Sequence, residues 1–134
     1  FAGSGALGLE AMSRGCGHGV LIDNDEAALT LVRNNAGNLG LGRKVTVLKL
    51  DAACLASPPR VAKTPAALAF LDPPYNSGLA LPALSGLRDK GWIEKGSVCV
   101  AEVAAREALE PPKGFDVMDE RTCGAARLVF LKTT

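Results

Sequence analysis

The chain has 134 residues, of which 48% are hydrophobic and 22% charged, the ordinary composition of a folded domain with its own core. Its 15 lysines and arginines nearly balance its 14 aspartates and glutamates, so the net charge of +1 excludes a broad basic surface for nucleic acid. No apolar run approaches the roughly 20 residues that a membrane-spanning helix needs, so we expect no contact with a membrane.

The glycine-rich turn at the start of the chain runs into the first expected helix. Leu7, Leu9 and Met12 supply the apolar side of this helix, and Gly15 can end it. Such a turn normally follows a strand. We therefore expect that a central strand precedes Phe1 and that the chain is an N-terminally truncated fragment.

Strand and helix patterns alternate through the rest of the chain. Short apolar runs predict strands at 20–22, 45–50, 66–71 and 97–103. Helices are expected at 26–38, which Asn24 or Asp25 can cap, and at 79–87, with a single helical turn at 52–56. Strands at 115–121 and 127–131 form a closing hairpin. This order predicts one α/β domain over 1–134, with a doubly wound, mostly parallel sheet and an antiparallel strand at the end.

The four cysteines are far apart in the sequence and include no Cys-x-x-Cys pair. We therefore expect buried, reduced thiols in a cytoplasmic protein without a signal peptide, and neither disulfides nor a metal site. The single histidine, His18, stands between glycines and is expected to be a surface or structural residue. The cysteines are Cys16, Cys54, Cys99 and Cys123.

Polar groups at three strand ends predict a nucleoside-binding groove. The run from Gly3 to Gly8 matches the pattern GxGxxG, which on its own could be a flexible turn. Asp23 closes the next strand about 20 residues on, where a carboxylate can accept hydrogen bonds from ribose hydroxyls. Asp51 closes the following strand, where a side chain can meet the edge of an adenine. The alternative for both carboxylates is helix capping or a loop position. A dinucleotide and S-adenosylmethionine both fit such a groove.

The tetrapeptide Asp72-Pro73-Pro74-Tyr75 follows the apolar run 66–71, which we interpret as a fully buried strand. The two prolines cannot continue a strand, because they have a fixed φ and no N–H. They predict a rigid loop at the carboxyl end of the strand, the edge where open α/β sheets bind ligands.

The tetrapeptide favours an amine methyltransferase over a dehydrogenase. The lone pair of an exocyclic amine is delocalised into its base, so the nitrogen is a poor nucleophile. The Asp72 side chain and the Pro73 carbonyl could hold its N–H groups and aim the lone pair at a methyl group. Tyr75 could stack on a base that is unpaired or flipped out of a duplex. The alternative is a rigid turn between strand and loop.

Segment 1–11 (FAGSGALGLEA), the tetrapeptide and the closing hairpin resemble the bacterial 16S ribosomal RNA guanine-N2 methyltransferases. These are class I S-adenosylmethionine-dependent enzymes with a Rossmann-like sheet, and the resemblance covers nearly all 134 residues. The first motif is fairly specific to this group, whereas adenine-N6 and other amine methyltransferases share the tetrapeptide. In the family, a segment before Phe1 supplies the first central strand and a basic region. Asp23 stands where many members have glutamate.

The resemblance implies methylation of a guanine N2 in small-subunit ribosomal RNA, either free or in an assembling particle, by a monomer. The residues implied at the target amine are Asp72, Pro73, Pro74 and Tyr75. Those implied at the S-adenosylmethionine cofactor are Phe1, Ala2, Gly3, Ser4, Gly5, Asp23, Asn24, Asp51, Ala52 and Asp72.

Three other functions stay open. The first is an adenine-N6 methyltransferase acting on DNA or RNA, the second a truncated module that binds cofactor or RNA without catalysis, and the third a nicotinamide-dependent dehydrogenase. Glu102, at the end of the strand 97–103, could border the pocket. Four cations could touch RNA phosphate, although solvated surface charges are the favoured interpretation: Arg88, Arg121, Arg127 and Lys132.

Overall fold

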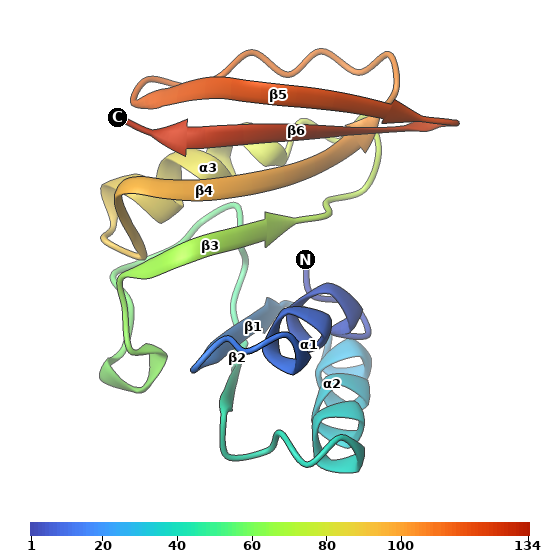
Figure 1. Cartoon of the computed structure of the whole chain (residues 1–134), viewed down its shortest axis with the longest axis vertical. Helices are drawn as coiled ribbons and strands as arrows, with labels where there is room; N and C mark the ends of the chain where they lie inside the picture. Colours follow the sequence, from blue (N-terminus) through green and yellow to red (C-terminus); the bar gives the residue numbers. More distant parts are fainter. The chain divides into compact units, whose positions relative to one another are not determined.

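Helices and strands alternate as expected in the computed structural model, which describes residues 1–134 (Figure 1). The chain forms two units, which are described in turn. The first comprises Phe1–Ala52 and Pro59–Lys63, and the second comprises Ala53–Pro58 and Thr64–Thr134. None of the helices combines the length and the apolar character needed to cross a membrane.

The first unit has two parallel strands and two α-helices. Its elements are α1 (Ala6–Ser13), β1 (Gly19–Asp23), α2 (Glu26–Asn38), β2 (Val45–Lys49) and the 3-10 helix η1 (Arg60–Ala62). β1 and β2 pair in parallel, with Asp23 opposite Lys49. The apolar stripes of both helices predict a core with β1, and the buried side chains are Leu9, Met12, Leu21, Leu29, Val32 and Ala36.

Local chemistry decides where the helices of the first unit begin. Asp25, rather than Asn24, caps α2, because its side chain accepts a hydrogen bond from the Ala28 N–H at 3.1 Å. Gly5 precedes α1 with a φ of +81°, in the left-handed region that glycine occupies without strain. The predicted bounds of α2 are therefore confirmed.

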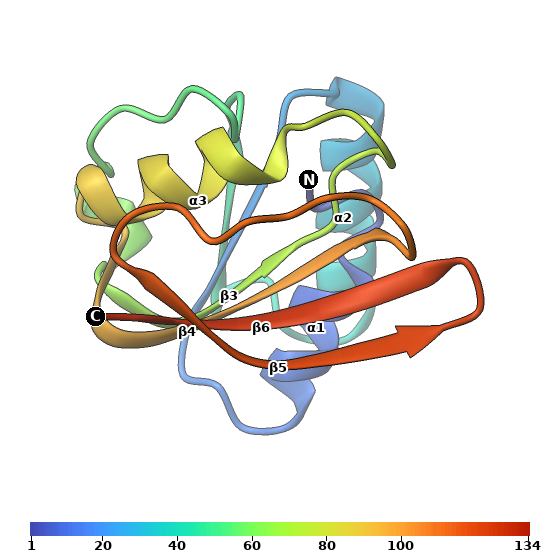
Figure 2. The ribbon, with the colours of Figure 1, turned by 90° about the horizontal axis from the view of Figure 1, so that it is seen from above.

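The second unit is a four-stranded sheet with one helix. Its elements are β3 (Ala66–Leu71), α3 (Ala80–Asp89), β4 (Ile93–Ala104), β5 (Phe115–Cys123) and β6 (Ala126–Thr133). The strand order is β3-β4-β6-β5; β3 and β4 are parallel, and β6 is antiparallel to both of its neighbours. The predicted antiparallel strand at the end of a parallel pair is confirmed. Figure 2 shows α3 lying over one face of this sheet.

The expectation that 66–71 is a fully buried strand is wrong. β3 lies at the edge of its sheet and pairs with β4 alone. Only Leu71 is buried, whereas Leu68 is 41% exposed and Phe70 is 39% exposed. An all-apolar run does not reveal whether both of its faces are covered, because that depends on which elements pack against it.

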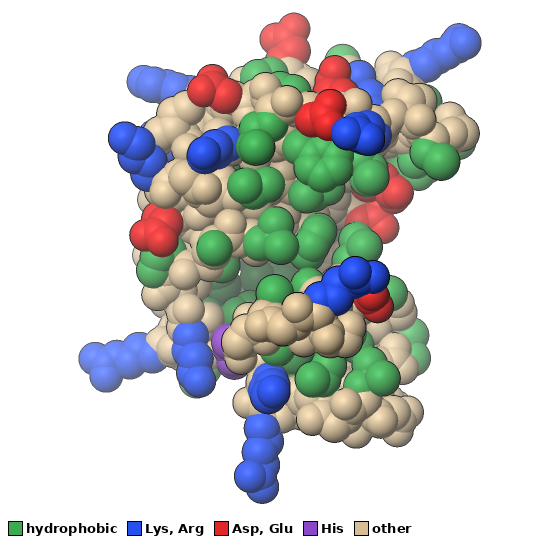
Figure 3. All heavy atoms as spheres, in the orientation of Figure 1, with side chains coloured by type: hydrophobic (Ala, Val, Ile, Leu, Met, Phe, Trp, Pro, Cys, Tyr) green, Lys and Arg blue, Asp and Glu red, His purple; other side chains and the backbone are tan.

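The sheet face opposite α3 is apolar and not covered by an element of the second unit. Leu68 pairs with Val98 across β3 and β4, and Phe70 pairs with Val100. Val100 in turn pairs with Phe130 of β6. Figure 3 shows hydrophobic side chains gathered over this sheet. The face turned to α3 holds the core instead, including Cys99, Ala101, Val103, Val129 and Leu131, all at most 1% exposed.

Three further expectations need correction. β4 begins at Ile93, not at 97, and its register with β3 shifts between Ala66, which pairs with Ile93, and Leu68, which pairs with Val98. Residues 52–56 form no helical turn. Of the four free cysteines only Cys99 is buried, and burial raises the pKa of its thiol to about 11. The other three, which are exposed because they lie in turns or at a strand end, are Cys16, Cys54 and Cys123.

Candidate functional site

In the first unit, Asp23 ties the glycine loop to the end of β1. Its Oδ2 accepts a hydrogen bond from the Gly3 N–H at 2.9 Å, and its Oδ1 accepts one from the Asp25 N–H at 3.0 Å. Just before the loop, the Ala2 N–H donates to the Ile22 carbonyl at 2.9 Å. The loop is therefore held at the carboxyl end of β1.

The environment of Asp23 keeps its side chain ionised. Partial burial raises the pKa of this carboxyl, whereas hydrogen bonds from the backbone N–H groups of Gly3, Asp25 and Asn24 lower it. The net pKa lies below the ordinary value of 3.8. A carboxylate has about four lone-pair positions, so the two hydrogen bonds leave acceptor capacity for a ligand hydroxyl.

Asp51 lies at the same edge of the first unit as Asp23. β1 and β2 run in parallel and end opposite each other, and the Leu50 N–H donates to the Asp23 carbonyl at 3.1 Å. Asp51 is the next residue and is exposed. Asn24 and Ala52, the other predicted contacts here, directly follow the two carboxylates. The fold therefore brings these predicted cofactor residues together at one strand edge.

The glycines of the loop differ in their surroundings. Gly3 has a φ of +58° and nothing within 4 Å of the position that a Cβ would take, so the space beside its backbone is open. Gly5 and Gly8 instead face the core, where a Cβ would lie 3.2 Å and 2.9 Å from Leu21 Cδ2 respectively. A ligand could thus approach the loop backbone at Gly3, while Gly8 lets α1 pack closely on β1.

Sequence reasoning missed Asn35 as a support of this loop. Its Nδ2 donates to the Ser4 carbonyl at 2.9 Å from the last turn of α2. The two residues are 31 positions apart, and no pattern in the sequence links them.

In the second unit, the tetrapeptide leaves β3 beside the end of β4. Leu71 pairs with Ala101, so Asp72 and Glu102 are the next residues on two adjacent parallel strands. Asp72 is exposed, Pro73 is buried and Pro74 is exposed. The carboxyl groups of Asp72 and Glu102 are close enough for each to influence the other's ionisation. Glu102 thus lies beside the tetrapeptide, and its role at the border of a binding pocket stays a prediction.

The closeness of the two carboxyl groups raises the pKa values of Glu102 and of Tyr75. The neighbouring carboxyl group of Asp72, together with partial burial, raises the pKa of Glu102 above 4.5. Partial desolvation and the charges of Glu102 and Asp72 raise the pKa of Tyr75 above 10.0. The phenol of Tyr75 therefore stays neutral, and its ring, 45% exposed, is free to stack.

A short turn follows Tyr75 and connects the tetrapeptide to α3. The Ser77 hydroxyl donates to the Pro74 carbonyl at 2.7 Å, and Asn76 has a left-handed φ of +57°. The Asn76 N–H donates to Glu107 Oε1 at 2.5 Å. Sequence reasoning missed Glu107, which lies in an irregular segment without a motif.

Three of the four cations considered for RNA have acidic neighbours. Arg121 pairs with Asp119 at 2.9 Å, and Arg88 pairs with Asp89 at 3.3 Å. Arg127, only 20% exposed, lies 3.7 Å from Glu120. These contacts favour structural or surface roles for the three arginines. No group of three or more metal-binding side chains occurs in the chain.

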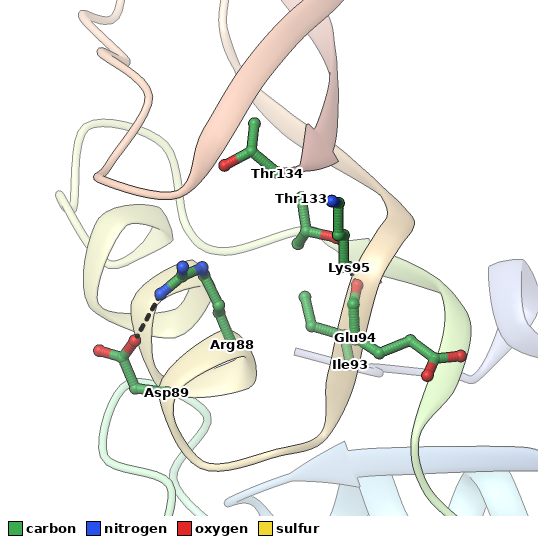
Figure 4. A pocket seen from close by; sticks show the side chains of 7 residues that line it. All are labelled: Arg88, Asp89, Ile93, Glu94, Lys95, Thr133 and Thr134. Carbon is green, nitrogen blue, oxygen red and sulfur yellow. Dashed lines mark hydrogen bonds and ion pairs between the residues drawn. The ribbon is translucent and has the colours of Figure 1, made fainter.

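A pocket of about 440 Å³ lies at the opposite end of the second unit's sheet from Asp72 (Figure 4). It contains none of the residues predicted at the cofactor or the target amine, only Arg88 of the four cations considered for RNA, and its two cations and two anions balance in charge. Its lining residues are Arg88, Asp89, Ile93, Glu94, Lys95, Thr133 and Thr134. The candidate residues are therefore those at the carboxyl strand ends of each unit and not those of this pocket.

A protein-family model described as Conserved hypothetical protein 95 matches residues 1–132. The chain belongs to this family. Ribosomal RNA small subunit methyltransferase D of Escherichia coli (strain K12) is 32% identical over 125 residues, which are 92% of this chain and 61% of that protein. The protein of the same name from Buchnera aphidicola subsp. Acyrthosiphon pisum is 27% identical over 121 residues, 90% of this chain and 62% of that protein.

The fold of the family is also found among solved structures. The structure of yhhF from Escherichia coli matches with a TM-score of 0.83 and 27% identity, covering 99% of this chain and 73% of that one. The expected Rossmann-like α/β fold and the expected family resemblance are thereby confirmed. The chain spans about three fifths of the length of the two curated relatives named above.

Proposed function

We propose that this protein uses S-adenosylmethionine to methylate ribosomal RNA, and that the target is the N2 amine of a guanine in the small subunit. The observation that carries the proposal is the tetrapeptide at the end of β3, where exposed Asp72 lies next to Glu102 of the neighbouring strand and is followed by the exposed ring of Tyr75. The names of the relatives support the same class of reaction and of RNA.

The residues of the first unit fit the cofactor. The open space at Gly3 would admit the methionine end, Asp23 would accept ribose hydroxyls and Asp51 would lie near the adenine. The neighbouring residues proposed to complete the contact are Phe1, Ala2, Ser4, Gly5, Asn24 and Ala52. When bound, S-adenosylmethionine supplies an electrophilic methyl group on a sulfonium.

The residues of the second unit fit an aromatic amine. Asp72 and the Pro73 carbonyl accept hydrogen bonds from the N–H groups of the amine and so direct the nitrogen lone pair toward the methyl group. They also stabilise the positive charge that develops on nitrogen. The proton leaves after the methyl group has been transferred, so no strong base is required. Tyr75 stacks on the base, which is worth roughly 1–3 kcal/mol. The base must be unpaired or flipped to enter.

The substrate follows from the same chemistry and from the relatives. We place the protein in the cytoplasm as a monomer that acts on small-subunit ribosomal RNA, free or in an assembling particle. With a net charge of +1, affinity for RNA must come from local contacts rather than from a general basic field.

The Asp72→Ala variant is expected to lose methyl transfer, because the amine N–H groups lose a charged acceptor. We expect a fall in kcat of at least about 100-fold, the scale of a lost oxyanion-type contact. The measurement is tritium transfer from labelled S-adenosylmethionine to 16S ribosomal RNA, followed by nucleoside analysis. The affinity for S-adenosylhomocysteine, measured by calorimetry, should change little.

A matched control is Asp116→Ala, which removes an exposed aspartate on β5 of the same unit. Equal activity of the Asp72→Ala variant and the wild type would refute the role of the tetrapeptide. N6-methyladenosine as the product would show that the target base is an adenine and not a guanine. Cofactor binding without any turnover would favour the non-catalytic module.

A further inference from the structure

We propose that Glu107 is a positioning residue that fixes the acceptor loop, defined as residues 72–77. The inference rests on the proposed function, because methyl transfer requires the loop to hold the target amine in one geometry. Glu107 touches neither of the groups proposed to contact the amine. It acts on them through the backbone of Asn76.

The contact is made by one carboxylate oxygen with two donors. Glu107 Oε1 accepts the Asn76 N–H at 2.5 Å and the Ala104 N–H at 3.3 Å. Asn76 belongs to the loop after β3, and Ala104 is the last residue of β4. A charged acceptor makes such bonds roughly twice as strong as a neutral one. Glu107 therefore joins the acceptor loop to the end of the neighbouring strand.

Glu107 is itself held by the closing hairpin. Its N–H donates to the Ala104 carbonyl at 3.0 Å, and its carbonyl accepts a hydrogen bond from Arg127 Nη2 at 2.6 Å. Arg127 lies on β6 opposite Val103 of β4 and is mostly buried. The position of the Glu107 side chain thus depends on the strand pairing of β4 with β6.

The acceptor loop needs an outside partner at Asn76. Pro73 and Pro74 have no N–H to donate, so they cannot anchor the loop through their own amides. Asn76 adopts a left-handed φ of +57°, which is uncommon for a residue with a side chain. The bond to Glu107 holds this conformation. Tyr75 then lies between two anchored positions of the loop, the buried Pro73 and the hydrogen-bonded Asn76.

The test compares Glu107→Ala and Glu107→Gln with the wild type, and with Glu110→Gln as a control at an exposed position nearby. The first readout is amide hydrogen exchange of Asn76 by NMR, which needs no methylation. We expect exchange at least about tenfold faster in Glu107→Ala. Glu107→Gln keeps a carbonyl acceptor and should restore part of the protection.

The second readout is methyl transfer to 16S ribosomal RNA. We expect kcat to fall about tenfold or more in Glu107→Ala, because the loop no longer presents Asp72 in one geometry, with unchanged affinity for S-adenosylhomocysteine. Glu110→Gln should match the wild type in both measurements.

The outcomes separate this inference from the proposed function. Unchanged exchange at Asn76 in Glu107→Ala overturns the inference whatever the activity. Faster exchange with full activity also overturns it, because the loop then needs no fixing. If Asn76 exchange depends on Glu107 while the wild-type protein methylates no RNA, the loop contact stands and the proposed function fails.

Discussion

At the scale of single residues, two carboxylates at strand ends have opposite environments. Asp23 accepts backbone N–H groups, which lower the pKa of its carboxyl, whereas Glu102 faces Asp72, which raises the pKa of Glu102. The first arrangement organises a loop around a fixed negative charge. The second brings two acidic groups together, at a cost that grows once both are ionised. Clustered acidic groups with perturbed pKa values are more common at functional sites than elsewhere.

The Glu102→Gln variant tests the acidic pair through its pH dependence. The folded-state pKa of Glu102 lies above 4.5, so its contribution to stability is fully present below that value and is lost as the pH rises through the raised pKa. Glutamine cannot ionise and can still donate to Asp72. The free energy of unfolding of the wild type should therefore fall relative to that of the variant as the pH rises above 4.5.

Urea denaturation at pH values from about 4 to about 8 measures this difference. Glu94→Gln, at an exposed position on the same strand, serves as the control and should show no such trend. Parallel pH profiles for the wild type and Glu102→Gln would show that the two carboxyl groups do not interact in solution.

At the scale of elements, the glycine loop depends on how closely α1 packs against β1. The Leu21 side chain is 4% exposed and fills the space beside Gly5 and Gly8. A Cβ on Gly8 would lie 2.9 Å from Leu21 Cδ2, closer than such atoms approach in folded proteins. The third glycine of the motif is thus explained by packing, and the first by open space for a ligand.

Gly8→Ala and Gly37→Ala form a matched pair of helix substitutions. Gly37 lies in α2 with nothing within 4 Å of its Cβ position, so alanine there should stabilise the protein by about 0.5–1 kcal/mol through helix propensity. At Gly8 the buried Leu21 must move, and we expect that variant to be less stable than Gly37→Ala by about 1 kcal/mol or more. Thermal and urea unfolding measure both; equal effects would mean that Leu21 adapts freely.

At the scale of the whole molecule, the chain combines a balanced charge with an apolar sheet face that no element of the second unit covers. This face of the second unit's sheet includes Leu68, Phe70, Val98, Val100 and Phe130 (Figure 3). Exposed apolar side chains are common on proteins, but a contiguous row on one sheet face is less so. Such a surface is expected to bind small apolar probes.

The Phe70→Ser variant tests this surface. We expect the 134-residue chain to enhance the fluorescence of anilinonaphthalene sulfonate, and Phe70→Ser to reduce the enhancement by about half. The control is Leu39→Ser, which removes a 60% exposed leucine next to the end of α2. Equal fluorescence of the wild type and Phe70→Ser would mean that the face is not accessible in solution.

Much of the fold was predictable because its signals are local. The strand at 66–71, the helix at 26–38 and the closing hairpin depend on apolar periodicity, a capping residue and a glycine turn, which short stretches of sequence contain. Burial was less predictable. The all-apolar run 66–71 and the exposed cysteines were misjudged, because exposure depends on elements that pack from elsewhere in the chain.

The sequence by itself determined which chemical groups lie at the strand ends: the glycines of the first loop, Asp23, Asp51 and Asp72, which two prolines follow. These follow from residue identity and from where each apolar run stops. Only the tertiary structure decided what those groups touch. The bonds from Asp23 to Gly3 and from Glu107 to Asn76, and the placement of Asp72 beside Glu102, bring together residues 20 to 31 positions apart. Such partners are set by strand register and loop paths, which are collective properties of the packed chain.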